Sequence, residues 1–320
     1  MAASVPGAAN ESLRDAFADT LLILGEADPD LVVLDGGATE ANCAPRFRER
    51  FPDRFMRLGA GEASIVARAA ELSHGSRTVF VSTFASVAAG PSYPTIRLSV
   101  CRDRANVKII GAHRERLADP ERGTPPMMED IGLMRGLPGM TVIVPGDAPT
   151  TRSAIRAVAG FRGPAYVRLA SGDFPTVTDG AFAIGRANEL RVGSDLTIVA
   201  IGTLLAPALA VADELRRVGI SARVLDLASV KPVDVPALLR AARETGAMLV
   251  LEEHTVETGI GALVAATTSE NYPVPVRRVG VPDVFAPIDD SRSGLDPLGL
   301  SISRIMDEAW ELLELRGKVQ

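Results

Sequence analysis

The sequence predicts an α/β fold made of two doubly wound domains, and three observations support this. The chain has 320 residues, which is long enough for two α/β domains. Hydrophobic residues make up 47% of it and charged residues 23%, as in ordinary globular proteins. Short apolar runs rich in Val and Ile alternate with helical segments, which is typical of parallel strands covered by helices on both faces.

In the first half of the chain this alternation predicts a domain over residues 1–175. Apolar runs bounded by turn-forming residues are interpreted as strands, and longer periodic segments as helices. In order, we expect helix Ser12–Gly25, strand Leu31–Asp35, helix Glu62–Ser73, strand Thr78–Ser82, helix Ser92–Asp103, strand Val107–Gly111, helix Glu129–Arg135, strand Thr141–Val144, helix Ala148–Ala159 and strand Ala165–Leu169.

Residues 176–194 lose this rhythm and are rich in Gly, Asp, Pro and Thr, so we expect a linker there. A second domain follows over residues 195–320. Its expected elements are strand Asp195–Ile201, helix Leu205–Val218, strand Ser221–Asp226, helix Val235–Thr245, strand Ala247–Glu252, helix Gly259–Glu270, strand Val274–Gly280 and helix Ser301–Leu315. The alternation in both halves predicts two doubly wound domains of unequal size.

Composition excludes several classes of partner and site. The net charge of −6, with scattered Arg and Lys, disfavours nucleic acid. Cys43 and Cys101 lack the spacing of a zinc site or a disulfide framework. The N-terminal residues do not resemble a signal peptide, and no apolar run reaches membrane length. We therefore expect a cytoplasmic protein with no membrane contact.

The segment from Leu58 to Leu72 is the most informative, because two glycines precede a carboxylate, Glu62, on the first turn of an apolar helix. An acid there can serve a site at the rim of the core, but it is equally explained by the helix dipole. Phe84 ends the next strand, where it can stack on a flat heteroaromatic ring or simply belong to the core.

Three histidines are present, and each has an alternative without catalysis. His74 ends a helix, where a cation suits the dipole. His254 follows a strand of the second domain and can bind a ligand or serve an interface. His113 follows strand Val107–Gly111 at the same edge as Phe84 and Glu62, so it is the best candidate for touching a substrate.

Glycines at 257–264 half resemble a dinucleotide-binding loop. The third glycine position is Val264, and no acidic residue ends a following strand, so a tight turn that opens a helix is favoured. The chain contains neither a phosphate-binding loop with Gly-Lys-Ser/Thr nor a Gly-x-Ser-x-Gly elbow.

A family resemblance emerges from longer motifs. The motifs are Phe80-Val81-Ser82-Thr83-Phe84-Ala85, Ile96-Arg97, Asn106-Val107-Lys108-Ile109-Ile110-Gly111-Ala112-His113, Met128-Glu129-Asp130-Ile131-Gly132-Leu133-Met134-Arg135, Pro138 through Ala148, Lys231-Pro232 and Val250-Leu251-Glu252-Glu253-His254. With them the chain resembles the C-terminal half of transketolase, in the form where the enzyme is split into two polypeptides. The resemblance covers nearly the whole chain.

This resemblance implies thiamine diphosphate as the cofactor. Glu62 would hydrogen-bond a ring nitrogen of the aminopyrimidine, and burial would raise its pKa and improve it as a donor. Phe84 and Val87 would pack on the pyrimidine, while His113, Glu121 and Ser171 would lie on the substrate side.

The family's other half binds the diphosphate through Mg²⁺ or a similar divalent ion, held by a Gly-Asp-Gly motif and an Asn. Gly146-Asp147-Ala148 and Gly172-Asp173-Phe174 lack the second glycine, so no metal ligand is assigned to this chain. The resemblance therefore implies an N-terminal transketolase subunit as partner, in an α2β2 heterotetramer that shares the cofactor.

Several positions depart from the family pattern. Val87 stands where a second Phe is usual, Pro125 where a substrate-handling His is usual, and Glu121 where an Asp is usual. Ser171 replaces a frequent phosphate-binding Arg, and Gly37 replaces an Asp near the thiazolium. These changes favour retained cofactor chemistry with an altered substrate.

The favoured hypothesis is a transketolase subunit that transfers a two-carbon ketol unit from a ketose donor to an acceptor, in a specialised biosynthetic pathway. Two alternatives stay open. The sequence Glu62-Ala63-Ser64-Ile65-Val66 also fits the β subunit of a 2-oxoacid dehydrogenase-type decarboxylase. Val87, Pro125 and Gly37 would instead fit a non-catalytic scaffold for a thiamine-enzyme partner.

Overall fold

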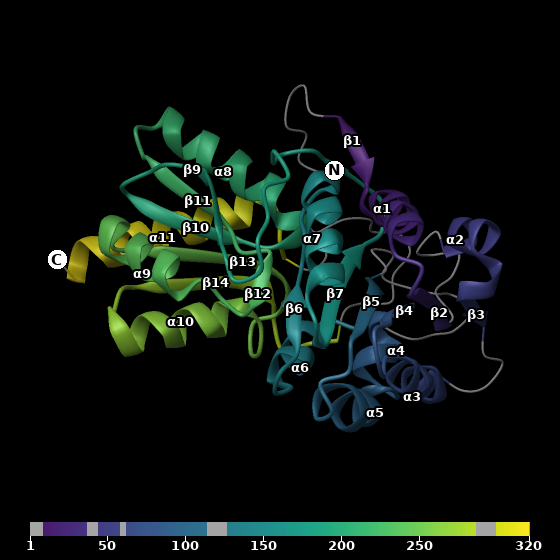
Figure 1. Ribbon diagram of the computed structural model, residues 1–320. Coiled ribbons are helices and arrows are strands. Elements are labelled where there is room, and N and C mark those ends of the chain that lie inside the picture. Colours follow the sequence, from purple (N-terminus) through teal and green to yellow (C-terminus); the bar gives the residue numbers. More distant parts are fainter. Residues whose placement is uncertain (1–8, 37–43, 58–61, 114–126, 286–298, 320) are drawn as a thin grey trace.

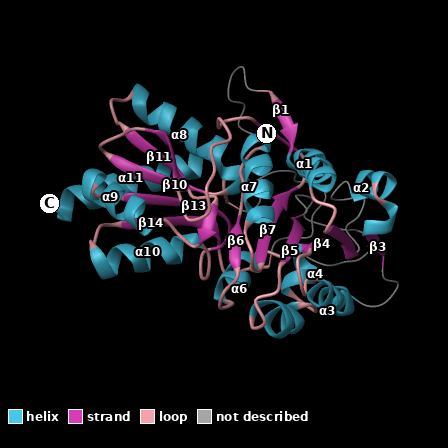
Figure 2. Ribbon diagram, viewed as in Figure 1, coloured by secondary structure: helices cyan, strands magenta, loops and turns pink. Residues whose placement is uncertain are grey.

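The computed structural model describes residues 9–36, 44–57, 62–113, 127–285 and 299–319. Within them, two open sheets lie side by side and helices cover each of them (Figures 1 and 2). Most strand pairs are parallel, and helices connect successive strands. The predicted fold class of two doubly wound α/β units is therefore confirmed.

The larger sheet has seven strands, and six of them are parallel. In order across the sheet they are β12 (Ser229–Lys231), β6 (Thr141–Ile143), β7 (Ala165–Ala170), β5 (Val107–His113), β4 (Thr78–Phe84), β2 (Leu31–Gly36) and β3 (Phe55–Arg57). The exception is β12, which comes from the C-terminal half and pairs antiparallel with β6.

Both faces of this sheet are buried, which explains why its strands are continuous apolar runs. Val79 and Val81 of β4 face one apolar cluster, whereas Phe80 between them faces another. Helices α1 (Leu13–Ala27) and α7 (Ala148–Gly160) supply the cluster around Phe80. The other face is covered by α3 (Glu62–Leu72), α4 (Ala85–Ala89), α5 (Tyr93–Thr95), the π-helical segment η2 (Ile96–Cys101) and α6 (Asp130–Gly136).

The smaller sheet has five strands in the order β14 (Val276–Val281), β13 (Met248–Thr255), β10 (Leu196–Ala200), β11 (Ala222–Asp226) and β9 (Asn188–Arg191). Helices α8 (Leu205–Arg217) and α11 (Ile302–Val319) pack on one face. On the other face lie α9 (Val235–Thr245) and α10 (Ile260–Asn271), and their apolar cluster continues into the first sheet. Val142 and Tyr166 share that cluster with Val199 and Val250, so one core joins the two halves.

Every predicted strand and helix is present, with ends shifted by a few residues. Some short elements were not predicted: α2 (Ala44–Arg50), the turn η1 (Pro52–Arg54), β3 and α4 in the first half, and the turn η3 (Gly202–Leu204) and β12 in the second. Two more strands were not predicted. Strand β9 lies within the expected linker and is an edge strand of the smaller sheet, and β8 (Asp173–Pro175) lies just before the linker and pairs with β1 (Asn10–Ser12). Most strands of three or four residues carry too little periodicity to be recognised from sequence, and β6 was predicted because its apolar run continues to Val144.

Candidate active site

The carboxyl ends of four parallel strands form a candidate edge for ligand binding. At this edge Gly36 of β2 pairs with Thr83, Phe84 of β4 pairs with Ala112, and His113 of β5 pairs with Ala170. From β2 the chain crosses to β3 on one side and then to β4 on the other. Such a switch point leaves a crevice outside the strand ends, where open α/β sheets bind ligands.

Four predicted site residues lie at this edge or directly after it. Phe84 ends β4, is partly buried and directly precedes α4, in which Val87 is also partly buried. Ser171 follows the last residue of β7 and is partly buried. His113 is the last residue of β5. It pairs with Ala170 at the end of β7, and the residue before it, Ala112, pairs with Phe84. The edge therefore brings the predicted pyrimidine-packing and substrate-side positions together.

Glu62 is the first residue of α3. Strand β3 runs parallel to β2 and ends at Arg57, so α3 begins at the same edge of the sheet. Ile65, Val66 and Ala69 anchor this helix in the apolar cluster under β2 and β4. A rigid, packed helix thus fixes the backbone position of Glu62. Gly37, Glu121 and Pro125 lie outside the described residues.

Sequence reasoning missed a buried carboxylate at this edge. Asp35 in β2 is 3% exposed and accepts a hydrogen bond from Arg57 Nε at 2.8 Å. It precedes Gly36 at the switch point. An Asp at the end of a fully apolar run was the available signal, because buried acids need a partner.

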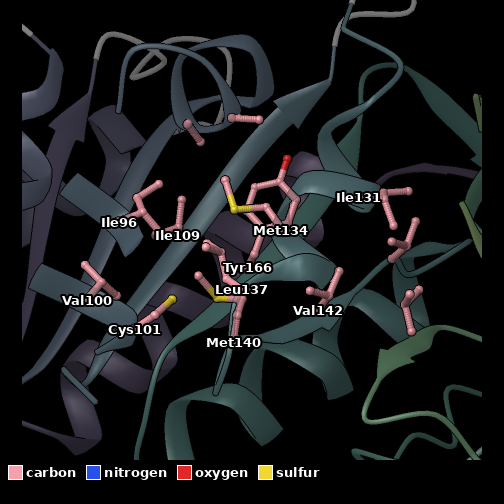
Figure 3. Close-up of a cluster of buried hydrophobic side chains, with 14 of the residues drawn as sticks. Ile96, Val100, Cys101, Ile109, Ile131, Met134, Leu137, Met140, Val142 and Tyr166 are labelled. Atoms are coloured by element: carbon pink, nitrogen blue, oxygen red, sulfur yellow. The ribbon is translucent and has the colours of Figure 1, made fainter. Parts of the chain in front are cut away.

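The second polar region is the seam between the two halves, which we define as Asp130, Gly132, Tyr166, Arg168 and His254 with their partners. Asp130 Oδ2 accepts a hydrogen bond from Tyr166 Oη at 2.6 Å and lies 3.6 Å from Arg168 Nε. Figure 3 shows Tyr166 at the centre of the apolar cluster, surrounded by Met134 and Leu137. Burial and the nearby Asp130 carboxylate raise the pKa of Tyr166 well above its ordinary value, so it stays a donor.

His254 belongs to this seam rather than to a ligand site. Its Nε2 accepts a hydrogen bond from Gly132 N at 3.0 Å, and its Nδ1 donates to Thr255 O at 2.9 Å. This pattern requires the neutral ring with the proton on Nδ1, and burial lowers the pKa of His254 accordingly. The interface alternative for His254 is thus the one that the geometry supports.

Other C-terminal residues reinforce α6 and α10. Lys231 Nζ donates to Arg135 O at 2.9 Å and to Leu137 O at 2.6 Å, at the C-terminal end of α6. Glu252 accepts hydrogen bonds from Ile260 N at 2.6 Å and Gly261 N at 3.0 Å. It therefore occupies the N-terminus of α10, where a dinucleotide phosphate would bind. Burial raises the pKa of Glu252 to about 7.

Gly259 and Asp147 also have structural explanations. A side chain at Gly259 would overlap the Glu252 carboxylate, so the glycine-rich turn serves a close approach rather than a nucleotide. Asp147 caps α7 by accepting from Thr150 N at 3.0 Å, and it also accepts from Val177 N and Thr178 N. Among the described residues, no group of three or more His, Cys, Asp or Glu is placed to hold a metal ion. Their helices include none long and apolar enough to cross a membrane.

Two family models match consecutive parts of the chain. The transketolase pyrimidine-binding domain matches residues 10–176, and the transketolase C-terminal domain matches residues 185–300. The first contains the candidate edge, and the second contains β13 with His254.

Two curated relatives match most of the chain. The chain is 36% identical over 307 residues to the 6-deoxy-6-sulfo-D-fructose transketolase subunit SqwH of Clostridium sp. MSTE9, covering 95% of each chain. It is 37% identical over 273 residues to an apulose-4-phosphate transketolase subunit of Phocaeicola vulgatus, covering 84% of this chain and 87% of that one.

A solved structure agrees with these sequence matches. The structure titled "Split gene transketolase, inactive beta4 tetramer" superimposes with a TM-score of 0.88 at 38% identity. The match covers 96% of this chain and 100% of the other.

Proposed function

The chain belongs to the transketolase family, and from that premise we propose that it is the C-terminal subunit of a two-component transketolase. It would transfer a two-carbon ketol unit from a ketose donor to an acceptor, and only with an N-terminal partner subunit. The observation that carries the proposal is the edge where Phe84 and His113 end adjacent strands, Ser171 follows the end of β7, and the helix that starts at Glu62 begins nearby.

Transketolases depend on thiamine diphosphate, which when bound supplies the carbanion-stabilising electron sink for ketol transfer. The residues of this chain fit the pyrimidine half of that cofactor. Phe84 and Val87 are partly buried and adjacent, so they offer apolar surface to a flat ring at the switch-point crevice. Glu62, held at the first turn of α3, would hydrogen-bond the ring. His113, at the end of β5, and Ser171, directly after β7, would orient the ketose.

We assign the diphosphate and its divalent metal ion to the partner subunit, in an α2β2 assembly. Gly146-Asp147-Ala148 is one of two segments that resemble Gly-Asp-Gly in part, and the Asp147 carboxylate already caps helix α7. The relatives named as split subunits support a two-chain enzyme. Their named substrates, a sulfonated ketose and an apulose phosphate, support an unusual donor for this chain as well, in line with Ser171 in place of an arginine.

Reconstitution tests this proposal. The chain is coexpressed with the product of an adjacent gene that carries Gly-Asp-Gly, and ketol transfer is measured with ketose phosphates, sulfonated ketoses and 2-oxoacids. We expect transfer from a ketose that requires both chains. Decarboxylation of a 2-oxoacid without any ketol transfer would support the 2-oxoacid dehydrogenase alternative. Full activity of the complex that carries Glu62→Gln would support the non-catalytic scaffold.

A further inference from the structure

Arg168 is an unusual residue for its position. It lies in β7, whose six residues are all buried, and is itself 3% exposed. Its strand neighbour Gly111 has no side chain, and the Tyr166 ring fills the space that a Cβ there would need. Burying a guanidinium costs free energy, and an apolar residue of similar volume is often as stable or more so. Stability alone therefore does not explain an arginine here.

The guanidinium joins three elements from both halves of the chain. Its Nη1 donates to Glu253 O of β13 at 2.7 Å, and its Nε lies 3.6 Å from Asp130 Oδ2 of α6. The planar fork of arginine can hold both partners at once, which an ammonium on a flexible stem cannot do equally well. Tyr166, two residues earlier on the same face of β7, binds the same carboxylate. Strand β7 is thus fixed at two successive positions against α6 and at one against β13.

Nη2 of Arg168 has no hydrogen-bond partner among the described residues. Arg168 also lines a small cavity at the seam with Pro145, Gly202, Thr203 and Glu253. Thr203 Oγ1 donates to the Glu253 carboxylate at 3.1 Å, so the far wall of this cavity is itself ordered. The side chain is therefore held by one hydrogen bond to Glu253 O and one ion pair with Asp130, and on its remaining side it borders the cavity.

The consequence lies at the edge. Ala170, two residues after Arg168, pairs with His113, and Ser171 follows it. At about 3.3 Å per residue, a shift of Arg168 is transmitted along a short stretch of strand to both substrate-side positions. Misplacement of reacting groups by about 1 Å can cost about 100-fold in rate.

We propose that Arg168 is a positioning residue through which the C-terminal domain sets the carboxyl end of β7, and with it Ser171 and His113. For its kinetic consequences the inference rests on the proposed function. It assigns the C-terminal domain a role in holding the substrate side of a site whose proposed residues in this chain lie on the other sheet.

The test compares Arg168→Met and Arg168→Lys with Arg223→Met. Arg223 is also a buried strand arginine, 6% exposed, paired with Glu189 and Glu244 in the smaller sheet and remote from β7. In the reconstituted complex, we expect kcat/KM for the donor to fall about 10- to 100-fold in Arg168→Met and less in Arg168→Lys. Cofactor affinity should change less than about twofold, and Arg223→Met should keep wild-type kinetics. Arg168 variants with wild-type kcat/KM, or equal losses in Arg223→Met, would overturn the inference.

Hydrogen exchange on the isolated chain separates this inference from the proposed function. We expect faster amide exchange at Ala170 and Ser171 in both Arg168 variants, and no change there in Arg223→Met. If the wild-type complex lacks ketol transfer, the proposed function fails while this exchange result still decides the role of Arg168. Unchanged exchange at the end of β7 contradicts the inference, and Arg168→Lys serves if Arg168→Met does not fold.

Discussion

The candidate edge and the seam differ in how deeply their side chains are buried. At the edge, Phe84, Val87 and Ser171 are partly buried, and Glu62 and His113 lie at the ends of elements. In the seam, Asp130, Tyr166, Arg168 and His254 are nearly inaccessible and bind one another or nearby backbone.

We interpret this difference as a division between residues proposed to bind a ligand and residues that fix the geometry of the fold. A buried polar group whose partners lie in the same chain stabilises an arrangement, and removing one partner leaves the other unsatisfied. A group at a strand end or helix start has less to lose on folding and more to offer a ligand. Edge variants should therefore lose activity or affinity. Seam variants should mainly lose stability, except at Arg168, which we propose also positions the edge.

The largest expected effect is at the edge. Glu62→Gln should lower turnover of the reconstituted complex by about 10²- to 10⁴-fold, because it removes the proposed proton-handling carboxylate. The free energy of unfolding should change by less than about 1 kcal/mol, the worth of a carboxylate at a helix start. Steady-state kinetics and urea denaturation measure the two quantities.

Glu71→Gln on the same helix is the matched control, since Glu71 is an exposed partner of Arg68 at 2.9 Å. It should leave both quantities unchanged. Comparable losses of turnover in the two variants would remove the distinction between Glu62 and an ordinary helix acid.

The next effect lies beside the seam and depends on pH. Burial, and then the Asp147 charge, raise the pKa of Asp226 to about 7. The folded state thus keeps a proton that the unfolded state releases near pH 4, so this group's contribution to stability is present at low pH and is lost as pH rises through about 7. The free energy of unfolding of Asp226→Asn, relative to that of wild type, should therefore rise by about 2–4 kcal/mol from pH 4 to pH 8.

Chemical denaturation of both proteins across that pH range measures this difference. In the variant the amide oxygen can still accept from Ala228 N, as Asp226 Oδ1 does at 2.9 Å. A difference that does not depend on pH would show that Asp226 is ionised in the folded chain.

Tyr166→Phe should lower the free energy of unfolding by about 1–3 kcal/mol, because a buried carboxylate loses a donor. Tyr93→Phe is the control, since its hydroxyl makes a longer bond of 3.3 Å to Leu133 O in a less buried place. Thermal and urea denaturation should rank the two variants in that order. Equal losses would mean that the Asp130 cluster contributes no more than a half-buried contact.

The smallest effect returns to the edge. Phe84→Ala should weaken cofactor affinity of the complex by about 3- to 10-fold, the worth of an aromatic contact of about 0.5–1.5 kcal/mol. Val87→Phe adds an aromatic ring three residues after Phe84 and should strengthen the cofactor affinity. Affinity from calorimetry that stays constant in both variants would exclude this surface as the ring-binding face.

Much of the architecture follows from apolar patterning. The strands around Phe80 and Val199 are buried on both faces, and such runs are recognisable without any partner information. The sequence did not predict that β12, from the C-terminal half, joins the larger sheet. Its pairing with β6 depends on tertiary contact rather than on the residue pattern of Ser229–Lys231.

The motifs gave the edge its candidate residues but did not reveal what the C-terminal motifs do. Lys231 and His254 each bind α6, and Glu252 fills a helix N-terminus. Which partner a His or Glu finds across a domain boundary is set by three-dimensional packing, so sequence could only leave the alternatives open. Arg168 gave a signal that was missed, since a charge inside an apolar strand requires buried partners.

The central claim is that this chain holds only half of a cofactor site, and calorimetry tests it most directly. Thiamine diphosphate with Mg²⁺ is titrated into the chain alone and into its complex with the partner subunit. We predict binding at least about 100-fold tighter in the complex, equivalent to about 2.7 kcal/mol. Equally tight binding by the isolated chain would contradict the shared site.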